Sequence, residues 1–260
     1  MSNDFKNPYA ELGRADSANY ITPDEAVILR DGGRKDFYCP DSDCRDPYRR
    51  LSLVEQKHKR PFFRHYHGYD HNSNPETLLH KLAVKWFADK TAFEIPSHES
   101  EGKALKQQTV QLDAAKTRLE YNIANTIRPD VMLHTESGFT FAVEIVVTSD
   151  VHSAKAKKIE LFNLPTLRID FSRFYLYNRE RCQTDKQFIE SSLNRLLADI
   201  NLKSWVKPPA WDKLPAEIEV IQITEPANEP ATTHTPQNEN TGCFVILPLI
   251  GAGYLLYTLL

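Results

Sequence analysis

The chain has 260 residues, 41% of them hydrophobic, and a formal net charge of −3. These values exclude a mostly disordered chain and a protein built from several membrane spans. They also exclude a chain that is basic throughout, so any nucleic-acid-binding surface must be local. We expect one α/β domain with smaller additions.

The N-terminal part is polar and divides in two. Residues 1–36 predict an extension with a short strand or two, and residues 37–74 hold two close cysteines and four histidines. The N-terminus lacks the basic-then-apolar layout of a secretory signal, so we expect a cytoplasmic protein. In that reducing compartment a close cysteine pair more often binds metal than forms a disulfide.

The two close cysteines predict a structural zinc site. Cys39 and Cys44 have a C-x4-C spacing, within the range of zinc knuckles. Histidines downstream can complete a tetrahedral site, and we favour His65 with either His67 or His71 as the fourth ligand. A polar stretch of this length needs more than core burial to order it, which favours Zn²⁺ over free cysteines in a solvated loop.

Basic and aromatic residues interleave in the same segment. Such a pattern is typical of surfaces that contact nucleic acid. The aromatic residues can equally form the small core of a zinc module, and the sequence leaves both readings open. The residues are Tyr48, Arg49, Arg50, Lys57, Lys59, Arg60, Phe62, Phe63, Arg64, Tyr66 and Tyr69.

Residues 75–224 predict a mixed sheet flanked by helices. Hydrophobic spacing separates strands from helices in this region, and Pro75 suits the first turn of the first helix. The sequence TESG between two strand-like runs predicts a hairpin. Strands are predicted over 92–96, 109–113, 117–123, 127–133, 139–148, 165–172 and 216–223, and helices over 75–90, 149–163 and 184–202.

The C-terminal region changes character twice. Residues 225–242 are rich in Pro, Thr, Asn and Glu and predict a linker. Residues 243–260 carry no charge and are just long enough to cross a bilayer as a helix. We favour a membrane anchor, although Pro248, Gly251 and Gly253 and the lack of flanking Lys or Arg also fit a strand pair packed on the domain or on a partner.

The predicted hairpin carries the chemistry. If His134 pairs with Thr140, Asp130 falls opposite Glu144 on the same face of the sheet. Two carboxylates across a strand pair repel each other unless a cation lies between them. Oxygen ligands of this kind suit Mg²⁺ or Mn²⁺.

These residues carry a resemblance to a known family. The segments 128–131 (RPDV) and 144–148 (EIVVT) resemble the PD-(D/E)XK nuclease motif. The helix with Glu76 and His80, the Phe63-Arg64-His65 stretch and the segment 165–172 resemble the bacterial subgroup close to competence protein CoiA-like nucleases. The resemblance covers roughly residues 37–172.

The resemblance implies a restriction-endonuclease-like fold with a small zinc-ribbon-like module before it. It implies metal-dependent hydrolysis of phosphodiester bonds, with DNA as the expected substrate. Asp130, Glu144 and the carbonyl of Ile145 would hold Mg²⁺, and Glu76 would be a third acid near the metal. Taken alone, Glu76 is equally an ordinary acid of a first helical turn.

One departure from the family pattern matters. The motif lysine would stand two residues after the second acid, where this chain has Val146. Lys155 or Lys158 from the following helix can substitute, or His80 can assist, although the two lysines also fit a solvated helix face. An inactive member acting as a nucleic-acid-binding or membrane-tethered adaptor is the alternative.

Overall fold

The computed structural model describes residues 9–15, 17–30, 32–33, 35–41, 44, 49–66, 77–148, 151 and 153–223. The chain forms two units, residues 1–223 and residues 224–260. The second unit lies outside the described residues, and with it the predicted linker and apolar tail. Among the helices of the described ranges, none is long and apolar enough to cross a membrane.

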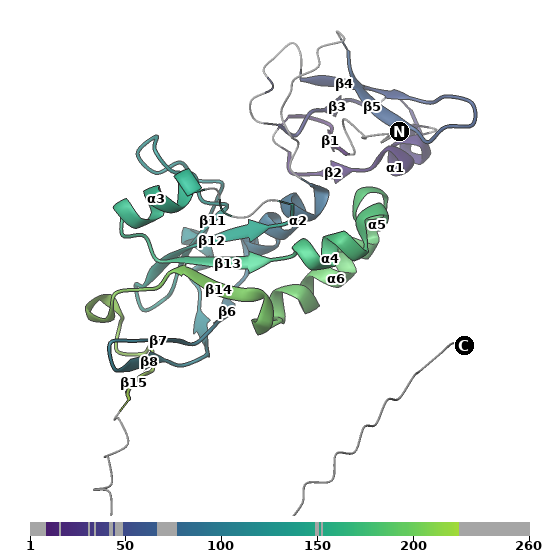
Figure 1. Ribbon diagram of the computed structural model, residues 1–260. Helices are drawn as coiled ribbons and strands as arrows, with labels where there is room; N and C mark the ends of the chain where they lie inside the picture. Colours follow the sequence, from purple (N-terminus) through teal and green to yellow (C-terminus); the bar gives the residue numbers. More distant parts are fainter. Residues whose placement is uncertain are drawn as a thin grey trace, which may run out of the picture. The chain divides into compact units, whose positions relative to one another are not determined.

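The N-terminal part forms an antiparallel sheet of five strands in the order β2-β1-β3-β4-β5 (Figure 1). Its core packs Phe37, Leu51 and Phe63 against Ala26 of helix α1. The residues predicted as a polar extension thus supply two strands and a helix to this sheet. The elements are β1 (Ala10–Leu12), β2 (Tyr20–Ile21), α1 (Pro23–Arg30), β3 (Phe37–Tyr38), β4 (Arg50–Val54) and β5 (Phe62–His65).

A second five-stranded sheet, in the order β10-β11-β12-β13-β14, carries the predicted hairpin. Strands β12 and β13 are parallel and are joined by helix α3, while the other neighbours pair antiparallel. This arrangement confirms a mixed α/β fold with a sheet flanked by helices. The elements are β10 (Arg118–Leu119), β11 (Val131–His134), β12 (Thr140–Val146), α3 (Ser153–Leu161), β13 (Thr166–Asp170) and β14 (Lys203–Lys207).

Helices α2 and α6 pack against each other on one side of this sheet. Their apolar residues recur at helical spacing, so Leu79 and Leu82 of α2 and Ile189 and Leu193 of α6 share one core with Val143 of β12. The helices are α2 (Leu78–Trp86), α4 (Ser172–Tyr177), α5 (Arg179–Thr184) and α6 (Lys186–Ala198), with short 3-10 turns η1 (Phe87–Asp89), η2 (Ala114–Lys116), η3 (Ile200–Leu202) and η4 (Trp211–Lys213).

Two small sheets complete the described fold. Strand β6 pairs with β9, and β8 lies between β7 and β15. The side chain of Lys203 on β14 reaches this region, where its Nζ donates to the carbonyl of Glu94 at 2.8 Å. The strands are β6 (Ala92–Ile95), β7 (His98–Ser100), β8 (Lys103–Leu105), β9 (Gln108–Gln111) and β15 (Val220–Gln222).

Several predicted elements differ from the structure at their ends. Helix α2 begins at Leu78 with Thr77 as its N-cap, three residues later than predicted. The strand predicted over 117–123 is shortened to β10 because Glu120 adopts a left-handed backbone with φ of 47°. Strand β14 and the β7–β8 hairpin were not predicted, since their residues alternate too weakly between apolar and polar.

Candidate functional site

The register of the β11–β12 hairpin is the one predicted. His134 pairs with Thr140 and Val131 pairs with Val143, so Asp130, just before β11, lies beside Glu144. Strand β12 is buried on both faces, and Glu144 is only 4% exposed. A carboxylate at such a position is costly without compensating partners.

The Asp130 carboxylate is held by two donors and one cation. Its Oδ2 lies 3.1 Å from Nε2 of His80 on α2 and accepts a 2.7 Å hydrogen bond from the backbone N–H of Ile145. Its Oδ1 lies 3.7 Å from Nζ of Lys155 on α3. Three separate elements therefore fix one carboxylate, which is the arrangement a functional site requires.

The ammonium of Lys155 lies between the two carboxylates. Besides its contact with Asp130, Lys155 Nζ lies 2.5 Å from Oε2 of Glu144. The other oxygen of Glu144, Oε1, is buried and has no hydrogen-bond partner among the described residues. A buried carboxylate oxygen without a donor is costly in a folded protein, so it marks a place that a ligand would satisfy.

The two carboxyl groups have opposite pKa shifts. Burial, followed by the charge of Asp130, raises the pKa of Glu144 to about 8 against the lowering effect of Lys155. Burial also opposes the ionisation of Asp130, but the hydrogen bond and charge of His80 and the charge of Lys155 outweigh it and lower the pKa of Asp130. Neighbouring acids with separated pKa values are typical of catalytic sites.

Of the other predicted site residues, the structure describes Lys158 and places it away from the two carboxylates. Nζ of Lys158 donates to the carbonyl of Thr126 at 2.8 Å, and the structure brings it to neither carboxylate. Lys155 is therefore the helix lysine that meets the acids. Glu76 lies outside the described residues. Val146, at the place of the motif lysine, is a buried apolar residue of β12.

A network of charged residues, not predicted from the sequence, lies next to the site along the chain. Lys81, next to His80, and Arg128, two residues before Asp130, both contact the carboxylate of Glu120. Burial favours the neutral carboxyl, but the hydrogen bond and charge of Lys81 and the charge of Arg128 lower the pKa of Glu120. The sequence did not indicate the left-handed backbone of Glu120, because Gly or Asn usually occupies such a turn.

Strand β13 adds two further charged groups that were not predicted. Arg168 pairs in parallel register with Glu144, which places both side chains on one face of the sheet. The guanidinium of Arg168 lies 2.5 Å from Oδ2 of Asp170. The alternation of Arg168 and Asp170 with buried Leu167 and Ile169 was the available sequence signal.

The N-terminal sheet holds a second candidate site. The ligand atoms of Cys39, Cys44 and His65 lie within 4.8 Å of one another, and all three residues are buried. Sγ of Cys44 lies 3.4 Å from Nε2 of His65. Burial raises the pKa of the Cys39 thiol to about 12 in the absence of an ion. This cluster can hold a metal such as zinc, as predicted.

The two candidates for the fourth zinc ligand, His67 and His71, lie outside the described residues. Among the described residues, the cysteine–histidine cluster is the one group of three Cys, His, Asp or Glu ligands this close together. The Asp130–Glu144 pair is therefore a two-carboxylate site within the described part of the chain.

The comparisons with known proteins add no assignment. No protein-family model, curated protein or solved structure matches the chain with significant similarity. The function of the chain is therefore inferred from the geometry of the two sites and from the motif resemblance.

Proposed function

We propose that the chain is a metal-dependent nuclease that hydrolyses phosphodiester bonds in DNA. The observation that carries the proposal is the convergence of Asp130, Glu144 and Lys155, with one Glu144 oxygen buried and without a described donor. The parallel β12–β13 pair with its α3 crossover also supports the restriction-endonuclease-like fold that the motif implies.

The donor set fits Mg²⁺ or Mn²⁺. Carboxylate oxygens of Asp130 and Glu144, with the carbonyl of Ile145, are the hard ligands that these ions prefer. When bound, the ion would supply an activated water and stabilise negative charge on the phosphate. Lys155 already places a positive charge beside both acids, so the two carboxylates are compensated by a cation in this structure.

The chain's own residues have separate roles in this proposal. His80 and the N–H of Ile145 orient Asp130 through the same oxygen, Oδ2. Val146 stands where the motif has a lysine, and Lys155 would take the role of that lysine. Its ammonium would stabilise the charge of the phosphate or orient the attacking water. For Lys155 to reach the phosphate or the water, its ion pair with Glu144 must open. Helix α3, which carries Lys155, has few buried residues, and this allows the movement.

The test is cleavage of labelled single- and double-stranded DNA with Mg²⁺ or Mn²⁺. Asp130→Ala and Glu144→Ala should abolish cleavage while the thermal unfolding stays cooperative. Glu136→Ala is the matched control, because Glu136 is an exposed acid at the turn of the same hairpin. If either active-site variant cleaves as well as the parent protein, the site is assigned wrongly.

A second candidate function rests on the same ion pair. Lys155 partly satisfies the two carboxylates without a metal, and Val146 removes the motif lysine, so an inactive nucleic-acid-binding adaptor fits these facts. Calorimetric titration with Mg²⁺ separates the two functions. A nuclease binds the ion through Asp130 and Glu144, whereas an adaptor with a purely structural ion pair does not.

For the N-terminal sheet we propose a structural zinc. Cys39, Cys44 and His65 supply three ligands, and His67 or His71 would supply the fourth. The three described ligands come from the loop after β3 and from β5, so the metal would tie together the two ends of the three-strand segment β3-β4-β5.

A further inference from the structure

The outer face of strands β4 and β5 is rich in exposed cations. Leu51 and Phe63 point into the core of the N-terminal sheet, whereas Arg50 and Arg64 alternate with them and are exposed. Arg64 lies opposite Ser52 in the register. The two arginines therefore present their guanidinium groups on the face away from helix α1 and the core, where Nη2 of Arg50 also lies 3.7 Å from Oδ1 of Asp36.

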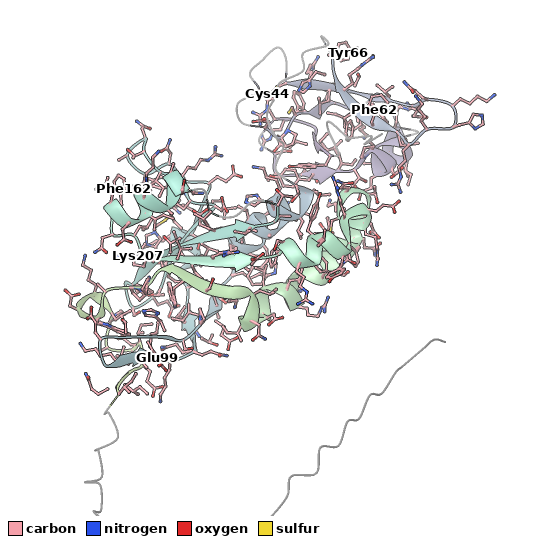
Figure 2. The ribbon with its side chains drawn as sticks, in the orientation of Figure 1. Cys44, Phe62, Tyr66, Glu99, Phe162 and Lys207 are labelled. Carbon is pink, nitrogen blue, oxygen red and sulfur yellow. The ribbon has the colours of Figure 1, made fainter. Side chains whose placement is uncertain are left out.

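Aromatic residues lie beside these cations. Tyr38 on β3 pairs with Arg50, whose guanidinium carbon lies 6.0 Å from the ring centroid. Tyr66 follows β5, its N–H donates to the carbonyl of Arg50 at 3.0 Å, and its side chain is 65% exposed. Figure 2 labels Tyr66 and also Phe62, which alternates with the buried Phe63. An exposed aromatic ring beside arginines is the combination on which a nucleobase stacks.

The β4–β5 hairpin extends the basic surface. Lys57, His58 and Lys59 form its exposed turn, and His58 has a left-handed backbone with φ of 65°. Between residues 50 and 66 the sequence has one acidic residue, Glu55, and its carboxylate pairs with Arg30 at 2.5 Å. Among the described residues no acid forms an ion pair with Lys57 or Lys59, so the turn adds positive charge to this surface.

We propose that this face binds single-stranded nucleic acid. Phosphates would contact Arg50, Arg64 and the lysines of the turn, and a base would stack on Tyr66. The aromatic ring favours a single strand, because a duplex buries the faces of its bases between neighbouring pairs. This inference rests on the proposed nuclease function in one respect: the surface would hold the substrate of the Asp130–Glu144 site.

Binding is measured separately from cleavage. The full chain in mild detergent is titrated into a fluorescein-labelled single-stranded oligonucleotide without Mg²⁺ and without chelator, so that bound zinc is kept and no strand is cut. The anisotropy is recorded at several salt concentrations. Arg50→Glu with Arg64→Glu tests the phosphate contacts, and Tyr66→Ala tests stacking.

The two variants should differ in how they depend on salt. Reversing both arginines should weaken binding about tenfold or more and reduce the slope of log affinity against log salt by about 1.4, since each phosphate contact contributes about 0.7. Tyr66→Ala should weaken binding about tenfold with the slope unchanged, and Tyr66→Phe should bind as the parent does. Zinc content and thermal unfolding check that each variant is folded.

Arg195→Glu is the matched control, because Arg195 is an exposed arginine on helix α6 outside this face. It should bind within about twofold of the parent protein. The proposal is overturned if the double variant binds as the control does, or if duplex binds as tightly as single strand and Tyr66→Ala has no effect. Binding that persists in a protein without nuclease activity would refute the nuclease proposal and leave this surface standing.

Discussion

Nζ of Lys155 lies 2.5 Å from Oε2 of Glu144, and these residues belong to different elements, helix α3 and strand β12. The contact brings a helix lysine to Glu144, two residues before Val146 on the same strand. It also keeps a buried carboxylate paired in the absence of a metal. If Lys155 acts in cleavage, its substitution should have a different effect than if it only stabilises the fold.

Lys155→Ala should lower the rate of DNA cleavage by about a hundredfold, because removing one group that stabilises developing charge has an effect of this size. Lys158→Ala is the matched control on the same helix, since its ammonium contacts the carbonyl of Thr126 instead of the acids. It should retain most of the activity. Equal losses in the two variants would show that helix α3, and not the Lys155 ammonium, is what cleavage needs.

The hairpin could be predicted from period-2 alternation and the TESG turn, whereas its register was an assumption that a one-residue slip would have broken. His134 opposite Thr140 then brings Asp130 to Glu144, as the structure confirms. The choice between Lys155 and Lys158 could not be made, because it depends on how α3 sits on the sheet. Both lysines lie on a helix that has a single buried apolar residue, Ile159, to set its rotation.

The contact of His80 with Asp130 could be expected only from the motif resemblance. Fifty residues separate the two side chains, and no local pattern joins them. The role of Glu120 could not be predicted for a different reason. Its role depends on a left-handed backbone that a non-glycine residue adopts only when tertiary contacts hold it, here those of Lys81 and Arg128.

Lys203 predicts a pH dependence of stability away from both sites. It is 6% exposed, and burial lowers its pKa from 10.5 to about 8. Between pH 8 and 10.5 the unfolded chain therefore binds more protons at this residue than the folded chain, so the free energy of unfolding should rise with pH. The gain is at most about 3 to 4 kcal/mol, at about 1.4 kcal/mol per unit of pKa shift.

Urea unfolding of Lys203→Met should lack this rise when compared with the parent protein from pH 7 to 10.5. Lys207→Met is the control on the same strand, because its ammonium pairs with Glu160 at 2.7 Å near the surface. Its stability should follow the parent curve. Parallel curves for Lys203→Met and the parent would mean that Lys203 titrates alike in the folded and unfolded chains.

Purified protein should contain about one zinc per chain, held by the cluster around Cys39. Cys39→Ser should lose the metal and lower the unfolding temperature, because metal binding and folding of a small module are coupled. Cys182→Ser is the control, since Cys182 is also a buried cysteine but lies in the other core. It should keep its zinc. Elemental analysis that finds no zinc in protein purified without chelators would exclude the site.

The uncharged segment 243–260 predicts membrane attachment. It lies outside the described residues, so the prediction rests on sequence alone: eighteen residues without a charge need an apolar environment. Full-length protein should sediment with membranes and resist extraction by high salt, because apolar insertion is not screened by ions. A 1–242 truncation should be soluble and keep any nuclease activity, since all described residues lie before it. Full-length protein that is soluble without detergent, or a truncation that unfolds, would instead make the tail part of the folded domain.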